Sequence, residues 1–133
     1  MIVSIGIDLV QIDRLQSITE RWEDRFLTKV YTQAERNSCF KRTTPYLALA
    51  GRFALKEAMF KALGTGWSEG VSWLEIEVIT DAHGKPMINA SGKVKELLIK
   101  KEVTAIHATT SHDGNYAIGQ VILEKTLRII TNN

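Results

Sequence analysis

The chain has 133 residues, a formal net charge of +2, and 44% hydrophobic and 24% charged residues. That length suits one domain, and the composition is that of an ordinary globular protein, which excludes a disordered chain. The net charge is too small to indicate nucleic-acid binding by itself.

The sequence carries no pattern typical of membrane insertion, secretion or disulfide bonding. No stretch approaches the roughly 18 apolar residues of a membrane span, and the first ten residues lack a basic region and contain Asp8. Cys39 is the only cysteine, so no internal disulfide can form. We therefore expect a cytoplasmic location, with Cys39 as a packing residue.

The first predicted element is a β-strand. Apolar and polar residues alternate from Ser4 to Leu9, which is the period-two pattern of a half-buried strand. In this pattern Asp8 lies on the face opposite Ile5 and Ile7.

A helix follows, because apolar positions recur at helical spacing at Ile12, Leu15, Thr19 and Trp22. Arginines seven and four residues apart share a second face of the same predicted helix: Arg14, Arg21 and Arg25. Such a face could steer an acidic partner, although most basic runs are simply solvated helix surfaces.

Two more helices have clear start signals. Thr32 and Glu35 form a capping-box pattern that begins a short helix. Thr44 precedes a longer helix, Pro45–Leu63, which Gly64 ends. This longer helix is rich in alanine and apolar nearly all round, so we expect neighbours on several sides.

The second half of the chain is predicted to be mostly strands. Alternation near residues 73–78, a turn at 81–86 and a short strand at 87–90 precede a helix that Ser91 caps. Strands at 104–111 and 116–124 flank a turn typical of a hairpin. The order of elements predicts an α+β fold with a mainly antiparallel sheet, as one domain over residues 1–124 with a tail at 125–133.

Glu57 is the first residue that indicates chemistry. It shares a stripe of the long helix with Phe53 and Phe60, where an uncompensated carboxylate is costly. Two explanations stay open. Lys61, one turn later, could form a structural ion pair, or a hard cation could bind with a second oxygen ligand from elsewhere. Asp8 is the candidate for that ligand, unless it only caps the following helix.

Four segments together resemble the holo-[acyl-carrier-protein] synthases, which are 4′-phosphopantetheinyl transferases. They are residues 6–14 (GIDLVQIDR), 51–66 (GRFALKEAMFKALGTG), 84–86 (GKP) and 107–113 (HATTSHD), in the order and spacing of that family. The first two are highly specific in combination. This sequence departs from the family at Thr110, where a larger aliphatic residue is usual, and in its longer tail.

The resemblance implies transfer of 4′-phosphopantetheine from coenzyme A to a serine of acyl carrier protein, releasing 3′,5′-ADP and supporting fatty acid biosynthesis. It implies that Asp8 and Glu57 bind Mg²⁺ and that Lys61 neutralises charge on the leaving phosphate. The general base stays open between Glu57, acting through a water, and His112 with Asp113.

The resemblance also implies binding residues and an assembly. The expected coenzyme A contacts are Arg52, Gly64, Thr65, Gly66, Gly84, Lys85, Pro86, Ser111 and His112. Arg14 and Arg21 match the early helix that docks the acidic carrier protein. The family forms a homotrimer with each active site at a subunit boundary.

Two other functions remain compatible with the residues alone. A non-catalytic ferredoxin-like binding module would use Glu57 and Lys61 as a structural pair, with Asp8 as a cap. A metal-dependent nucleotide hydrolase would release pantetheine phosphate from coenzyme A without a carrier protein.

Overall fold

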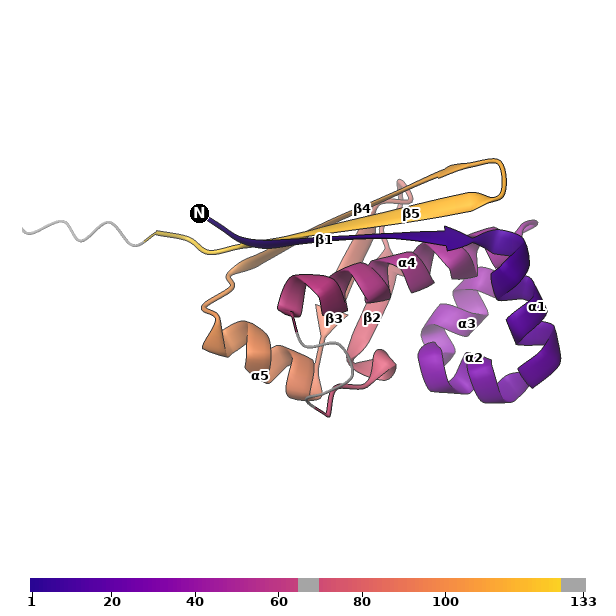
Figure 1. Ribbon diagram of the computed structural model, residues 1–133, viewed down its shortest axis with the longest axis horizontal. Helices are drawn as coiled ribbons and strands as arrows, with labels where there is room; N and C mark the ends of the chain where they lie inside the picture. The colour runs from indigo at the N-terminus through magenta and orange to yellow at the C-terminus, as the bar shows by residue number, and fades with distance from the viewer. Residues whose placement is uncertain (65–69, 128–133) are drawn as a thin grey trace, which may run out of the picture.

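The computed structural model describes residues 1–64 and 70–127, and Figure 1 shows a helix lying along one face of a three-stranded sheet. The sheet has the order β1 (Ile2–Gln11), β5 (Tyr116–Glu124), β4 (Ala105–Asp113), and both pairings are antiparallel. The helix is α4 (Pro45–Leu63). The predicted α+β class with an antiparallel sheet is confirmed.

Helix α4 begins and ends where the sequence predicts. Pro45 occupies its first turn, and Gly64 ends it in the left-handed conformation with φ of 75°. Thr44 stands at the N-cap position but makes no capping hydrogen bond through its side chain. No helix among the described residues is long and apolar enough to cross a membrane.

Two glycines let α4 lie directly on the backbone of the sheet. A Cβ at Gly6 would come within 1.8 Å of the Ala58 carbonyl oxygen. A Cβ at Gly119, on β5, would come within 2.7 Å of the Ala54 carbonyl carbon. Both approaches are too close for any side chain, so the contact between helix and sheet depends on these glycines.

The close contact decides which face of β1 is buried. The face with Gly6 and Val10 meets α4, and Asp8 lies on that face beside the helix. Residues of the opposite face are half or more exposed in the single chain: Ile5, Ile7 and Leu9. Asp8 and the isoleucines lie on opposite faces, as predicted, but the isoleucine face points away from the core.

The early helix is shorter than the sequence predicts. Helix α1 (Ile12–Trp22) ends at Glu23, whose positive φ of 52° breaks the chain direction before α2 (Asp24–Val30). Trp22 is therefore exposed rather than part of a buried stripe. Arg25 belongs to α2, yet its guanidinium lies over the Trp22 ring together with that of Arg21, at 6.0 and 5.7 Å.

The remaining elements form a second layer around α4. Helix α3 (Gln33–Phe40) begins with the predicted capping box of Thr32 and Glu35. A two-stranded antiparallel sheet pairs β2 (Ile76–Thr80) with β3 (Pro86–Ala90). Cys39 is buried, which fits a packing role.

Two details of this layer differ from the prediction. Trp73–Glu75 forms a 3₁₀ turn (η1) where the alternating pattern indicated strand, so that strand begins only at Ile76. Helix α5 (Gly92–Lys100) follows Ser91, whose side chain makes no capping bond. The Glu75 carboxylate instead accepts the Val94 N–H at 2.9 Å and caps that helix from a distance.

Candidate active site

Strand β1 and helix α4 bring together the three residues at the centre of the predicted chemistry. Lys61 donates from Nζ to Asp8 Oδ1 at 3.0 Å and to the Ile7 carbonyl oxygen at 3.0 Å. Glu57 lies one turn before Lys61 and is half-buried. Within the described residues Glu57 forms no ion pair with Lys61, so the structural pair considered from the sequence is not present.

The charges at this position are unbalanced. Burial raises the pKa of Glu57, the negative charge of Asp8 raises it further, and the positive charge of Lys61 opposes both effects. The Asp8 carboxylate lies close enough for its charge to act on Glu57, and the two carboxylates together form a hard oxygen donor set.

That donor set fits a small divalent cation. Mg²⁺ usually takes one or two carboxylates from the protein and completes its shell with water and substrate phosphates. No group of three or more potential metal ligands occurs in residues 1–64 and 70–127. An ion held here by described side chains would therefore use Asp8 and Glu57 alone.

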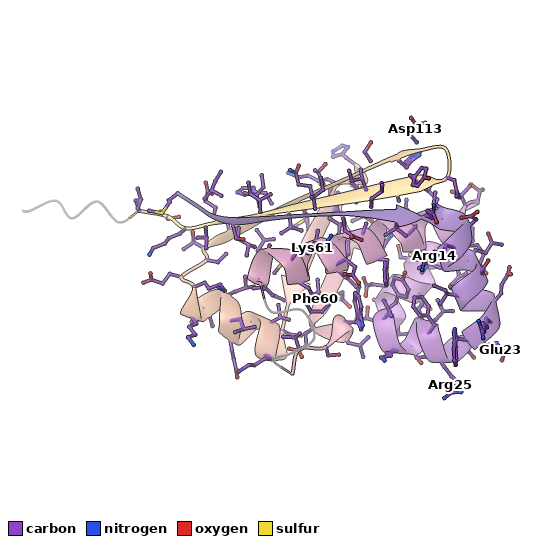
Figure 2. The ribbon with its side chains drawn as sticks, viewed as in Figure 1. Arg14, Glu23, Arg25, Phe60, Lys61 and Asp113 are labelled. Atoms are coloured by element: carbon purple, nitrogen blue, oxygen red, sulfur yellow. The ribbon has the colours of Figure 1, made fainter. Side chains whose placement is uncertain are left out.

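Asp8 and Glu57 open into a surface groove of about 600 Å³ between β1, α1 and α4, which we call the carboxylate groove. Its walls include Arg14, Ile18 and Phe53. Arg14 is exposed on α1 (Figure 2) and thus adds a positive charge beside the two carboxylates. Arg21 does not line this groove; its guanidinium lies over Trp22 at the end of α1.

A second cavity, the arginine cleft, encloses about 160 Å³ between α4, β4 and the β2–β3 sheet. Its lining includes five residues expected to contact coenzyme A: Arg52, Gly84, Pro86, Ser111 and His112. Arg52 is 5% exposed, donates from Nη2 to Ser38 Oγ at 3.2 Å, and has no partner for its buried Nε in the described structure.

Arg42 and Thr44 also line the arginine cleft, and neither was expected from the sequence to bind a ligand. Both lie within three residues of Pro45, where α4 begins, and the start of a helix attracts anions through its free N–H groups and its dipole. A basic residue just before a long predicted helix was the available signal.

The two cavities lie on opposite faces of α4. Phe53 and Glu57 line the carboxylate groove, whereas Gly51, Arg52 and Leu55 line the arginine cleft, and no residue lines both. Residues two positions apart on a helix, as Phe53 and Glu57 each are from Leu55, project about 200° apart. One chain therefore separates the expected metal ligands from the expected nucleotide contacts by the width of a helix.

Other predicted site residues lie elsewhere. Figure 2 shows Asp113 at the tip of the β4–β5 hairpin, far along the molecule from Lys61. His112 lines the arginine cleft, and no hydrogen bond joins it to Asp113 among the described residues. Lys85 is exposed and outside the lining of the cleft, although its N–H is held by Asp81 Oδ1 at 2.9 Å.

The glycine segment after α4 is only partly described. Gly64 ends the helix and is exposed. Thr65 and Gly66, which the resemblance assigns to coenzyme A binding, lie outside the described residues.

Comparisons with known proteins agree on one family. Residues 4–121 match the sequence model of the 4′-phosphopantetheinyl transferase superfamily. A holo-[acyl-carrier-protein] synthase of Syntrophus aciditrophicus is 44% identical over 124 residues, which cover 93% of this chain and 97% of the relative.

Solved structures show the same likeness in three dimensions. The crystal structure of holo-[acyl-carrier-protein] synthase from Neisseria meningitidis has a TM-score of 0.86 at 30% identity, and covers 94% of this chain and 100% of that one. A holo-(acyl-carrier-protein) synthase from Bacillus anthracis, in complex with CoA (3′,5′-ADP), has a TM-score of 0.77 at 37% identity, covering 95% and 99%. The chain therefore belongs to the 4′-phosphopantetheinyl transferase superfamily, within the family of the holo-[acyl-carrier-protein] synthases.

Proposed function

We propose that this transferase moves 4′-phosphopantetheine from coenzyme A to a serine of acyl carrier protein with Asp8 and Glu57 as its Mg²⁺ ligands. The observation that carries the proposal is the meeting of two carboxylates and Lys61 where β1 crosses α4, in a chain of this family. Mg²⁺ bound there would neutralise charge on the pyrophosphate of coenzyme A.

Lys61 supplies the positive charge that the protein itself brings to the reaction. The serine oxygen attacks the β-phosphate and its proton passes to the general base, for which Glu57 through a water and His112 with Asp113 are the candidates. The bond from that phosphorus to the bridging oxygen breaks, and 3′,5′-ADP leaves with the electron pair. Lys61 is 56% exposed at its side chain and can follow the charge that develops on the leaving phosphate. Its long flexible side chain can exchange Asp8 for a phosphate oxygen without movement of α4.

The arginine cleft suits the 3′-phosphoadenosine end of coenzyme A. Arg52 offers a buried guanidinium whose Nε has no partner in the described residues, and His112 and Arg42 add further donors. The cleft volume of about 160 Å³ lies below the roughly 300–1,000 Å³ of typical ligand sites, so one chain encloses only part of the ligand.

We propose that two copies of the chain complete each active site, within a homotrimer. The pyrophosphate and the 3′-phosphate of one coenzyme A cannot reach opposite faces of the same helix, so the carboxylate groove and the arginine cleft would come from different copies. The exposed face of β1, with Ile5, Ile7 and Leu9, offers the apolar surface for such an interface.

The proposed macromolecular partner is an acidic acyl carrier protein docking on α1. Arg14 stands beside the carboxylates, and Arg21 and Arg25 lie near the other end of α1 around Trp22. This arrangement gives an acidic helix several contacts next to the site where its serine must react. The buried, unpaired Cys39 suits a reducing compartment, and we propose the cytoplasm.

The direct test combines the protein with Mg²⁺, coenzyme A and an apo acyl carrier protein, and then measures the mass of the carrier. The proposal expects the mass to increase by one phosphopantetheine group, and EDTA to prevent the increase. Release of pantetheine phosphate without a carrier would instead identify a hydrolase. An unchanged carrier and unchanged coenzyme A would contradict both activities.

A further inference from the structure

Lys56 is a charged residue that cannot reach the substrate. It directly precedes Glu57 in the chain, but its side chain is fully buried on another side of α4. Its ammonium group makes three hydrogen bonds, to Val30 O at 2.8 Å, Glu35 Oε1 at 2.7 Å and Trp73 O at 3.0 Å. An ammonium group has three donors, so none is left for a phosphate.

Glu35, the partner of Lys56, accepts three hydrogen bonds. Its Oε1 accepts from Lys56 and from the Thr32 N–H at 2.9 Å, while its Oε2 accepts the Val78 N–H at 3.1 Å. Burial lowers the pKa of Lys56, and the negative charge of Glu35 opposes that shift. The pair therefore joins α3 to α4 on one side and to β2 on the other.

The two elements that this pair joins to α3, helix α4 and strand β2, both form walls of the arginine cleft. Val78 lines the cleft directly, and its N–H is the group that Glu35 holds. On the other wall, Arg52 lies one turn before Lys56 and is held by Ser38 of α3. A second link from α3 to β2 runs from Thr32 Oγ1 to Glu77 Oε2 at 2.7 Å. Helix α3 thus fixes the distance between the two walls.

We propose that Glu35 and Lys56 are positioning residues for nucleotide binding: they set the distance between Arg52 and the β2 wall of the arginine cleft. This inference rests on the proposed function of the cleft. The inference gives the two charged neighbours on α4 different roles. Glu57 acts at the carboxylate groove, whereas Lys56 acts only through the packing of α3 and β2.

A purely stabilising role is the alternative, and it makes a different prediction. Replacing a buried ion pair by apolar residues of similar volume is often neutral or stabilising, whereas removing one partner is strongly destabilising. The double variant Glu35→Leu/Lys56→Met should therefore fold more readily than either single variant, while losing the directional bonds to Thr32, Val30, Trp73 and Val78. Stability and wall position can then be measured separately.

The experiment measures the binding of 3′,5′-ADP by calorimetry, well below the melting temperature of each variant. We expect the double variant to bind 3′,5′-ADP at least about tenfold more weakly, with a matching increase in the KM for coenzyme A and an unchanged KM for the carrier protein. Glu96→Gln, which alters an exposed ion pair on α5, is the matched control and should bind as the wild type does. A folded double variant with wild-type affinity for 3′,5′-ADP would overturn the proposal.

A measurement on the unmodified protein keeps the test decisive if the double variant does not fold. If the Glu35–Val78 bond positions the cleft wall, ligand binding must stabilise that bond in return, since coupling is reciprocal. Hydrogen exchange of the Val78 amide should therefore slow at least about tenfold when 3′,5′-ADP is added. An unchanged exchange rate under saturating 3′,5′-ADP would contradict the positioning role.

Arg52→Ala distinguishes failure of this inference from failure of the proposed function. If Arg52→Ala leaves 3′,5′-ADP binding unchanged, the arginine cleft is not the nucleotide site, and the proposed role of the cleft falls together with the inference. If Arg52→Ala weakens binding and the double variant does not, only the positioning role is lost.

Discussion

Lys61 pairs with Asp8, 53 positions earlier in the chain, although Glu57 lies one turn before it on the same helix. The ammonium group thereby neutralises the carboxylate on the strand. Glu57 keeps the excess negative charge. Burial raises the pKa of Glu57, the charge of Asp8 raises it further, and Lys61 opposes both effects. Lys61 and a bound cation would therefore compete for the charge of Asp8.

Asp8→Asn should reduce turnover by at least about 100-fold, because the substitution keeps the shape and removes half of the anionic charge of the proposed metal site. Added Mg²⁺ and coenzyme A should raise the melting temperature of the wild type and should raise that of Asp8→Asn much less. Steady-state kinetics and thermal melts measure both effects. If Asp8 and Glu57 bind one ion, the turnover of the Asp8→Asn/Glu57→Gln double variant will be little lower than that of either single variant. Additive losses of turnover would disprove a shared ion.

Glu57→Gln should stabilise the protein in metal-free buffer at neutral pH. Because the folded-state pKa is raised, the native state holds more protons than the unfolded chain between the ordinary value of about 4.3 and the raised value. The stability of the wild type therefore decreases as the pH rises through that interval. The variant should not show this decrease, because glutamine does not titrate. Thermal melts from pH 4 to pH 8 test this. A lower melting temperature for the variant at pH 7 would instead indicate that a positive partner holds Glu57.

Lys61→Met should separate activity from stability. The ion pair with Asp8 is exposed on the lysine side, so its removal should change the free energy of unfolding by less than about 1 kcal/mol. Turnover should fall on the order of 100-fold, because Lys61 is proposed to supply positive charge where negative charge develops on the leaving phosphate. Lys93→Met, which removes an exposed lysine paired with Glu96, is the control and should keep full activity. Equal turnover in both variants would exclude a catalytic role for Lys61.

Arg14→Ala should raise the KM for the carrier protein and make it less sensitive to ionic strength. Charges at a docking surface act mainly on association and are screened by salt. Arg14 is exposed on α1 and lies outside the arginine cleft, so the KM for the carrier protein should increase more than the KM for coenzyme A, although the proposed pyrophosphate site shares its groove. A comparable increase in both KM values would contradict the assignment of Arg14 to the carrier protein.

Asp8→Ala and Arg52→Ala should complement each other when refolded together. Each variant retains one of the two cavities, so about a quarter of all subunit boundaries in an equal mixture would carry an intact pair. Activity of the mixture, compared with each variant refolded alone, measures this. Light scattering that finds a fully active monomer would disprove the shared site.

The parts of the fold that depend on local signals could be predicted from the sequence. Pro45 and Gly64 bound α4 as expected, and the hairpin between β4 and β5 follows from its glycine turn. The break at Glu23 could not be predicted, because a glutamate carries no signal for a positive φ. Alternation along β1 identified the two faces but not which one meets the core, since that depends on the later position of α4.

The candidate site was predictable to a similar extent. The meeting of Asp8 with Glu57 required the family resemblance, because strand and helix periodicity do not place two distant elements together. Helical spacing suggested Glu57 as the ion-pair partner of Lys61, but in the structure Lys61 pairs with Asp8 on β1 instead. The buried pair of Glu35 and Lys56 gave no signal of its own, since Glu35 was already accounted for by its capping box.

The glycines beneath α4 also constrain how this enzyme can change over generations. Any side chain at Gly6 would push α4 away from β1, and Glu57 and Lys61 would move with it while Asp8 stayed on the strand. The same displacement would open the hydrophobic core on both sides of the helix. Mutations that displace α4 at this position therefore also destabilise the core, so selection for stability would by itself preserve the alignment of Asp8, Glu57 and Lys61.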